Sequence, residues 1–284
     1  TWVNIGMPMV YDSIGHGNYP LGYGANSQEV LLYSFMAAYS GKDANNVDLS
    51  LFKKIALPNW SVNFTGLTRI PTLKKIFKTI NITHSYRSTY SISTWATNIN
   101  YSEDNQMMLY ENTNIRVPEF DMSQIVLSEQ YAPLIGVKLT FNNNLSPSFD
   151  FKKSRTITIN FTNNQLTEAA GREFVIGCGY TFKDLGIIFS SGSGTSRKAN
   201  DLTLKLDLGF RKDVTILRSI DENYSQISSG QNKMNIYFTA DYDFSNRLGM
   251  QAFFRHDVTD PFIANSFKTS NTFAGVTLRF SLTQ

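Results

Sequence analysis

The sequence is poor in several features that define common protein classes. Its single cysteine, Cys178, excludes an internal disulfide bond. The longest apolar run, residues 30–39 with Ser34 inside it, is too short for a transmembrane helix, which needs about 20 residues. Neither sign of charge dominates: 26 Lys and Arg stand against 23 Asp and Glu, and a net charge of +3 is too small to indicate nucleic-acid binding.

Residue patterns of catalytic, metal and nucleotide sites are also missing. The three histidines are His16, His84 and His256, and no zinc spacing, P-loop or dinucleotide fingerprint accompanies them. We therefore expect no enzyme, no metal site and no cofactor. The alternative is an outer-membrane hydrolase, which would need polar residues grouped around His256 and Asp257.

Strict alternation of apolar and polar residues is the strongest positive signal. It is clearest in residues 202–210, 234–242 and 272–282, where every second residue is apolar. A period of two predicts strands with one apolar and one polar face. Cys178 shares the apolar parity of such a strand, and we interpret it as a small hydrophobic residue.

The alternation and the turn residues between the alternating segments predict eleven strands. They cover residues 59–65, 79–101, 120–141, 149–161, 173–183, 186–190, 202–211, 214–219, 233–243, 247–256 and 272–282. The connections are expected to alternate between short ones (142–147, 184–185, 212–213, 244–246) and long ones (102–119, 162–172, 191–201, 220–232, 257–271). Short periplasmic turns and long external loops follow each other in this way in outer-membrane barrels.

Two other segments differ from this pattern. Residues 1–58 are not strand-like, and Ser27 is expected to begin a short helix that ends near Gly41, within a loop or a lumenal insertion. Residues 66–79 place Arg69, Lys74 and further lysines beside apolar residues at helical spacing. This segment is either a connector with a solvated basic face or a membrane-surface or partner-binding helix.

The fold class predicted is all-β: a transmembrane antiparallel β-barrel over 59–284, preceded by the insertion 1–58. Since bacterial single-chain barrels have an even number of strands, eleven strands predict the C-terminal arc of a larger barrel. The apolar face would contact lipid and the polar face would line the lumen. By parity, the lumen-facing candidates are Lys138, Lys205, Asp207, Asn235, Asp241, Gln251 and Arg279.

Lys153 and Arg155 do not fit this assignment, because they share the apolar parity of Phe149 and Phe151. A cation that faces lipid at the membrane midplane costs about 2–4 kcal/mol, and much less near an interface. We expect either a β-bulge that moves both side chains to the other face, an interfacial position, or contact with a protein partner.

A resemblance to a known family extends over nearly the whole chain. The sequence resembles the C-terminal end of the SprA/Sov family, the outer-membrane translocons of the type IX secretion system of Bacteroidetes-type bacteria, which are associated with gliding motility. The matching segments are GYGANSQEVLLYSFMAAYSGKDANNVDLS (22–50), LPNWSVNFTGLTRIPTLKKIFKTINITHSYRSTYSI (57–92), LSEQYAPLIGVKLTF (127–141), KKSRTITINFTNNQLTE (152–168) and SNTFAGVTLRFSLTQ (270–284).

The resemblance implies part of a very large barrel in the bacterial outer membrane that passes folded cargo proteins carrying a type IX C-terminal signal. Its implied partners are this cargo, a PorV-like barrel, a periplasmic plug protein and outer-membrane lipid. It implies no catalytic residue. The alternatives left open by the residues themselves are a porin or nutrient-transporter barrel and a soluble β-sandwich adhesin.

Overall fold

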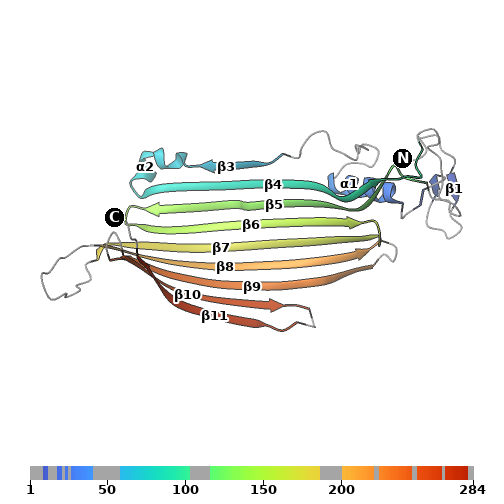
Figure 1. Ribbon diagram of the computed structural model, residues 1–284. Coiled ribbons are helices and arrows are strands. Elements are labelled where there is room, and N and C mark those ends of the chain that lie inside the picture. The colour runs from blue at the N-terminus through green and yellow to red at the C-terminus, as the bar shows by residue number, and fades with distance from the viewer. Residues whose placement is uncertain are drawn as a thin grey trace.

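The computed structural model of the chain describes residues 9–11, 18–20, 23–24, 27–40, 58–102, 116–185, 200–220, 224–244, 248–263 and 266–280. Its main feature is a nine-stranded antiparallel sheet (Figure 1). The strands are β3 (Trp60–Phe64), β4 (Phe77–Thr97), β5 (Phe120–Phe141), β6 (Leu145–Asn160), β7 (Gln165–Leu185), β8 (Asn200–Ser219), β9 (Tyr224–Asp243), β10 (Leu248–Pro261) and β11 (Thr269–Phe280).

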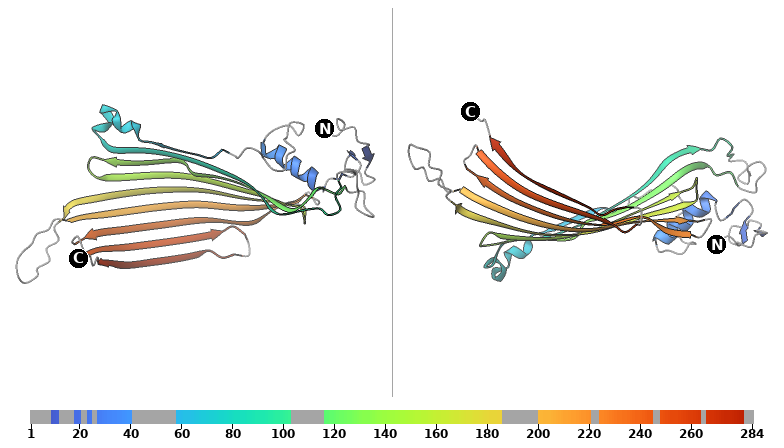
Figure 2. Two further views of the ribbon diagram at one scale, coloured as in Figure 1. Left: turned by 45° about the horizontal axis from the view of Figure 1, so that its top comes forward. Right: turned by 90° about the horizontal axis from the view of Figure 1, so that it is seen from below.

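Every strand of this sheet pairs with its neighbours in the sequence, in the order β11-β10-β9-β8-β7-β6-β5-β4-β3. The all-β fold class is therefore confirmed. The sheet is open among the described residues, since β3 and β11 each pair on one side only. Figure 2 shows that the long strands are strongly twisted, as expected for L-amino acids.

The smaller elements are β1 (Met9–Tyr11), β2 (Asn18–Pro20), α1 (Gln28–Ser40), the 3-10 turn η3 (Gly66–Arg69) and α2 (Pro71–Lys74). The helix expected after Ser27 is confirmed as α1. The β1–β2 pair corrects the expectation that residues 1–58 contain no strand. None of the described helices has the length and apolarity needed to cross a bilayer.

The helical stretch expected over 66–79 is much shorter than predicted. It breaks into η3 and α2, and Phe77 already lies in β4, where it pairs with Phe141 of β5 at a ring-centroid distance of 4.6 Å. Cross-strand pairing of these two rings outweighs the helical spacing of the sequence.

The predicted alternation of short and long connections is wrong. Residues 212–213 form no turn but continue β8, because Lys212 pairs with Arg172 on one side and with Asn232 on the other. The strand predicted at 186–190 lies outside the described residues. One end of the sheet has the connections 142–144, 186–199 and 244–247, and the other end has 98–119, 161–164, 220–223 and 262–268. Each end thus combines long with short connections.

α1 covers one end of the sheet, near the connections 98–119 and 161–164 (Figures 1 and 2). Its apolar residues Leu31, Leu32, Phe35 and Met36 form a buried cluster with Met122, Ile125, Leu127, Ile157 and Ile159 of β5 and β6. The Gln28 amide fixes the start of the helix, since it donates to the Phe120 carbonyl (2.8 Å) and accepts from the Met122 N–H (2.9 Å). We call this part of the sheet the capped end.

Candidate membrane-facing and channel-facing surfaces

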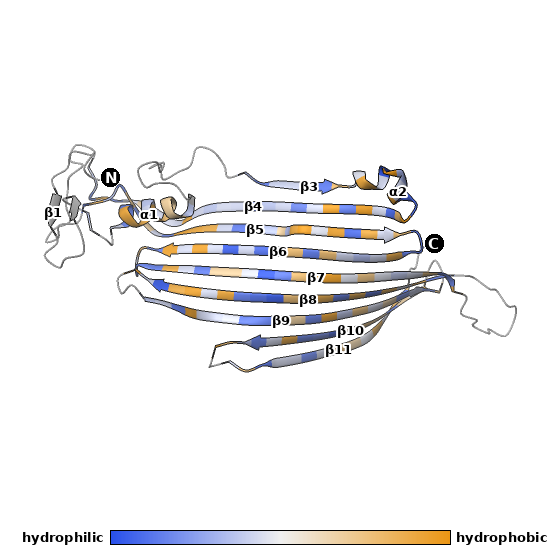
Figure 3. Cartoon of the chain, turned by 180° about the vertical axis from the view of Figure 1, so that it is seen from behind, coloured by the Kyte–Doolittle hydropathy of each residue, from blue (hydrophilic) through white to orange (hydrophobic). Residues whose placement is uncertain are grey.

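The register of the sheet divides its residues into two unlike faces. Residues that pair across an antiparallel ladder point to the same face. Leu208 pairs with Ile176 and Ile236, whereas its neighbour Asp207 pairs with Gly177 and Tyr237. We call the first the apolar face and the second the polar face. The alternation is visible along the strands in Figure 3.

All seven predicted lumen-facing residues lie on the polar face. They are Lys138, Lys205, Asp207, Asn235, Asp241, Gln251 and Arg279. The structure brings three of them together at Asp241, which accepts a hydrogen bond from Gln251 Nε2 (2.6 Å) and lies 3.9 Å from Arg279 Nη2. The other four are distributed over β5, β8 and β9.

Glycines make room for polar side chains on this face. A Cβ atom on Gly177 would lie 2.4 Å from Ser148 Oγ and 2.5 Å from Asp207 Oδ1, and one on Gly209 would lie 2.6 Å from Asn235 Oδ1. Polar side chains from neighbouring strands therefore lie directly over these glycines. The result is a closely packed hydrophilic layer over β6, β7, β8 and β9.

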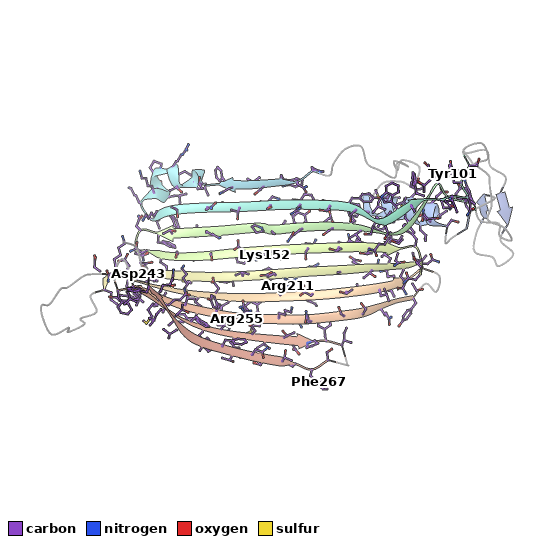
Figure 4. The ribbon with its side chains drawn as sticks, in the orientation of Figure 1. Tyr101, Lys152, Arg211, Asp243, Arg255 and Phe267 are labelled. Atoms are coloured by element: carbon purple, nitrogen blue, oxygen red, sulfur yellow. The ribbon has the colours of Figure 1, made fainter. Side chains whose placement is uncertain are left out.

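An ion-pair network at mid-height of the polar face was missed by the sequence reasoning. Glu173 of β7 lies between Lys152 of β6 (3.3 Å) and Arg211 of β8 (3.8 Å), and Arg211 also binds Asp213 (2.9 Å) (Figure 4). Arg255 and Asp257 of β10 form a similar ion pair two residues apart, with 2.6 Å between Arg255 Nε and Asp257 Oδ2. The i, i+2 spacing of Arg and Asp is the signal that the sequence offers for this network, but the polarity of residues 212–213 favours a turn.

A cavity of about 100 Å³ adjoins this network. Lys152, Glu173 and Arg211 border it, together with Ser154 and Gly171. A Cβ atom on Gly171 would lie 2.8 Å from Ser154 Oγ and 2.9 Å from Asp213 Oδ1, so the glycine makes room for these two polar side chains beside the cavity.

The residues that would form a hydrolase centre are not brought together. His256 lies on the apolar face, where its Nδ1 is 2.8 Å from Thr272 Oγ1, while Asp257 lies on the polar face with Arg255. Among the residues that the structure describes, no three metal-ligating side chains gather.

The apolar face carries a continuous band of uncharged side chains. It includes alternate residues of Phe174–Phe182 in β7, Leu202–Phe210 in β8 and Met234–Tyr242 in β9. Each segment has nine residues, within the ~9–11 residues with which a tilted β-strand crosses a bilayer. Ile176 (49%) and Phe210 (45%) are about half exposed, whereas Tyr242 at the border of the band is only 3% exposed. We call it the uncovered band.

Aromatic rings follow both borders of the uncovered band. Near the connections 142–144 and 244–247, the ring pairs are Phe77–Phe141 (4.6 Å), Tyr180–Phe182 (4.6 Å) and Tyr242–Phe244 (4.9 Å). Toward the capped end they are Trp60–Tyr86 (4.4 Å), Tyr86–Tyr131 (4.8 Å) and Phe151–Phe174 (4.5 Å). Two aromatic girdles around an apolar band are typical of transmembrane barrels.

Lys153 and Arg155 remain on the apolar face. β6 pairs with β7 from Leu145 to Asn160 without a register shift, so no bulge in β6 moves them. The irregularity lies in the neighbouring strand β5, between Tyr131 and Ile135. Both cations lie outside the uncovered band, on the side of the capped end. Arg155 binds Glu168 (2.8 Å), which also binds Arg218 (3.1 Å).

No protein-family model and no curated protein matches the chain.

Proposed function

We propose that the chain is a section of the wall of an outer-membrane β-barrel. The uncovered band faces lipid, and the polar face borders an aqueous channel. The observation that carries the proposal is the uncovered band itself, which crosses all nine strands without an Asp, Glu, Lys or Arg side chain and lies between two aromatic girdles. Two histidines, His84 and His256, lie within it. In a soluble sandwich a second sheet would cover such a band, and no described segment does so.

The open edges support a wall that continues beyond the described strands. Among the described residues, β3 and β11 each present a row of backbone groups without a partner strand, and such groups cost several kcal/mol each in lipid. Further strands would satisfy them. Eight strands are enough to close a small barrel, yet the nine strands that the structure describes form an open sheet. These features favour a large barrel.

We infer that this barrel is the protein-conducting translocon of a type IX secretion system, which passes folded cargo from the periplasm to the cell surface. The resemblance to the SprA/Sov family supports this assignment, and a wide wall with a hydrophilic, glycine-lined inner face suits the passage of a folded protein. Cargo with a type IX C-terminal signal, a PorV-like barrel and a periplasmic plug protein are the proposed partners. A porin or nutrient transporter is the second candidate, because the same wall could enclose a narrower pore.

Site-specific photo-crosslinking tests the proposal. A photoreactive amino acid replaces Asn235 or Asp241 on the polar face, or Phe238 on the apolar face, in the complete polypeptide in its native membrane. We expect adducts with secreted proteins at the first two positions and with lipid at Phe238. Solute permeation without any protein adduct at the polar positions would favour the porin. Protein adducts at Phe238 alone would contradict both membrane functions.

A further inference from the structure

Three cations stand side by side on the apolar face, directly beyond the uncovered band. Lys153 of β6 pairs with Arg172 of β7, and Arg172 pairs with Lys212 of β8. Adjacent strands are about 4.8 Å apart, so the row extends over roughly 10 Å. All three side chains are exposed. We call Lys153, Arg172 and Lys212 the basic row.

The basic row lacks carboxylate partners. Among the described residues, none of its three members forms an ion pair, and Lys212 has only a contact with the ring of Phe262 (5.5 Å). Two carboxylates on this face are engaged elsewhere: Glu168 binds Arg155 and Arg218, and Glu129 accepts a hydrogen bond from Tyr86 (2.9 Å). Asp260 of β10 lies in the same row, but it is two strands away from Lys212, with Asn232 of β9 between them.

Like charges directly opposite each other destabilise a sheet. The basic row therefore has an electrostatic penalty that an anion would remove. The position of the basic row indicates which kind of anion it binds. The neighbouring row, which is the first row of the uncovered band, consists of Phe151, Phe174 and Phe210, and the rings of Phe151 and Phe174 are stacked with an interplanar angle of 8°. Aromatic rings beside cations are typical of the zone where hydrocarbon meets head groups.

We propose that the basic row binds the phosphate groups of a phosphorylated lipid, in the membrane leaflet next to the capped end. This inference rests on the proposed membrane function. Arg172 can bind two phosphate oxygens at once through its planar guanidinium, and the two lysines act as point charges on either side. The acyl chains of the same lipid would then lie against Phe151, Phe174, Phe210 and the rest of the uncovered band.

Lipid binding to the detergent-purified complete polypeptide provides the test, with native mass spectrometry to count bound lipids. The probes are diphosphoryl lipid A, zwitterionic phosphatidylcholine and inorganic phosphate. One variant combines Lys153→Gln, Arg172→Gln and Lys212→Gln. Its matched control combines Lys152→Gln, Arg211→Gln and Lys233→Gln, which removes the same charge from the adjacent row of the polar face.

We expect diphosphoryl lipid A to bind the basic-row variant about 100-fold more weakly than the unchanged protein, since each cation near an anionic membrane surface contributes about a fivefold factor. The control should bind within about twofold of the unchanged protein. Equal binding of diphosphoryl lipid A by the two variants would overturn the inference. Equally strong binding of inorganic phosphate and of diphosphoryl lipid A to the unchanged protein would also overturn it. Loss of a copurifying protein without loss of lipid would show a protein partner instead.

A single substitution gives a second readout that does not depend on the triple variant folding. In plain detergent, Arg172→Gln should match or exceed the heat stability of the unchanged protein, because it relieves like-charge repulsion. With diphosphoryl lipid A present, the unchanged protein should be more heat-stable than Arg172→Gln. The same order in both conditions would contradict lipid binding. Recovery of the unchanged protein outside the membrane fraction would instead refute the membrane function itself.

Discussion

The apolar face of the sheet has two parts with different surroundings, one on β5 and β6 beneath α1 and one exemplified by β7 and β8. At the capped end, Ile125 (0% exposed) and Ile159 (1%) lie beneath α1. In the uncovered band, Ile176 and Phe210 are about half exposed. Among the described residues, α1 covers the first part and no segment covers the second. A lipid bilayer is the cover that suits a band bounded by aromatic girdles.

The largest expected effect is a difference in stability loss between alanine substitutions of two isoleucines on this face, Ile159 and Ile176. Ile159→Ala should lower the stability of the capped end by about 2–5 kcal/mol, since it opens a cavity in a closed cluster. Ile176→Ala should change stability by about 0.5 kcal/mol or less in detergent, where no packed protein surrounds the side chain. Hydrogen exchange of the β6 and β7 amides measures both. Similar losses for the two substitutions would remove the distinction between the two parts.

A lysine placed at mid-height of the uncovered band tests its contact with lipid. Phe238→Lys should reduce membrane insertion by the equivalent of about 2–4 kcal/mol, because it exposes a cation to hydrocarbon. Tyr237→Lys is the matched control, since Tyr237 lies next to it on the polar face. The measurement is the folded fraction in the membrane, judged by heat-modifiable migration on gels. Equal yields from the two variants would argue against lipid contact at Phe238.

The Gln28 amide offers a smaller perturbation, confined to the capped end. Gln28→Ala removes both hydrogen bonds to β5 and should weaken the docking of α1 by about 1–2 kcal/mol. Gln28→Glu retains an acceptor for the Met122 N–H but cannot donate to the Phe120 carbonyl, so we expect a similar loss. Faster exchange of α1 amides, with β9 unchanged, would confirm that the cover acts locally. Loss of exchange protection across the whole sheet would contradict it.

The smallest expected effect is a loss of stability of the docked helix α1 at alkaline pH. Burial, and secondarily the Glu29 carboxylate, raise the pKa of Tyr33 from 10.0 to about 12, and burial also raises the pKa of Tyr39. Below the ordinary pKa both folded and unfolded states are protonated, so the stabilisation is fully present. It is lost as the pH rises from 10 toward 12, because the undocked tyrosine ionises first.

Tyrosinate absorbance as a function of pH measures this transition. Subtracting the titration of a Tyr33→Phe variant isolates the Tyr33 component, which we expect to titrate near pH 12. A component that titrates at the ordinary tyrosine pKa would show that α1 leaves this ring exposed.

Much of the fold could be predicted from alternation alone. The period of two located β5 from Phe120 to Phe141 and assigned all seven lumen-facing candidates to one face, since parity depends only on local strand geometry. Strand ends were harder to predict. Arg211, Lys212 and Asp213 have the polarity of a turn, but hydrogen bonds to β7 and β9 on both sides keep them in β8. Local composition cannot report such pairing.

The sequence by itself determined that this chain forms long antiparallel strands with one apolar and one polar face, because side-chain direction alternates along any strand. Only the tertiary structure decided which part of the apolar face α1 covers and which cations stand in one row. Both depend on the register between strands, and a shift by one residue would move every side chain of a strand to the other face. Lys153, Arg172 and Lys212 are far apart in the sequence and become neighbours only through that register.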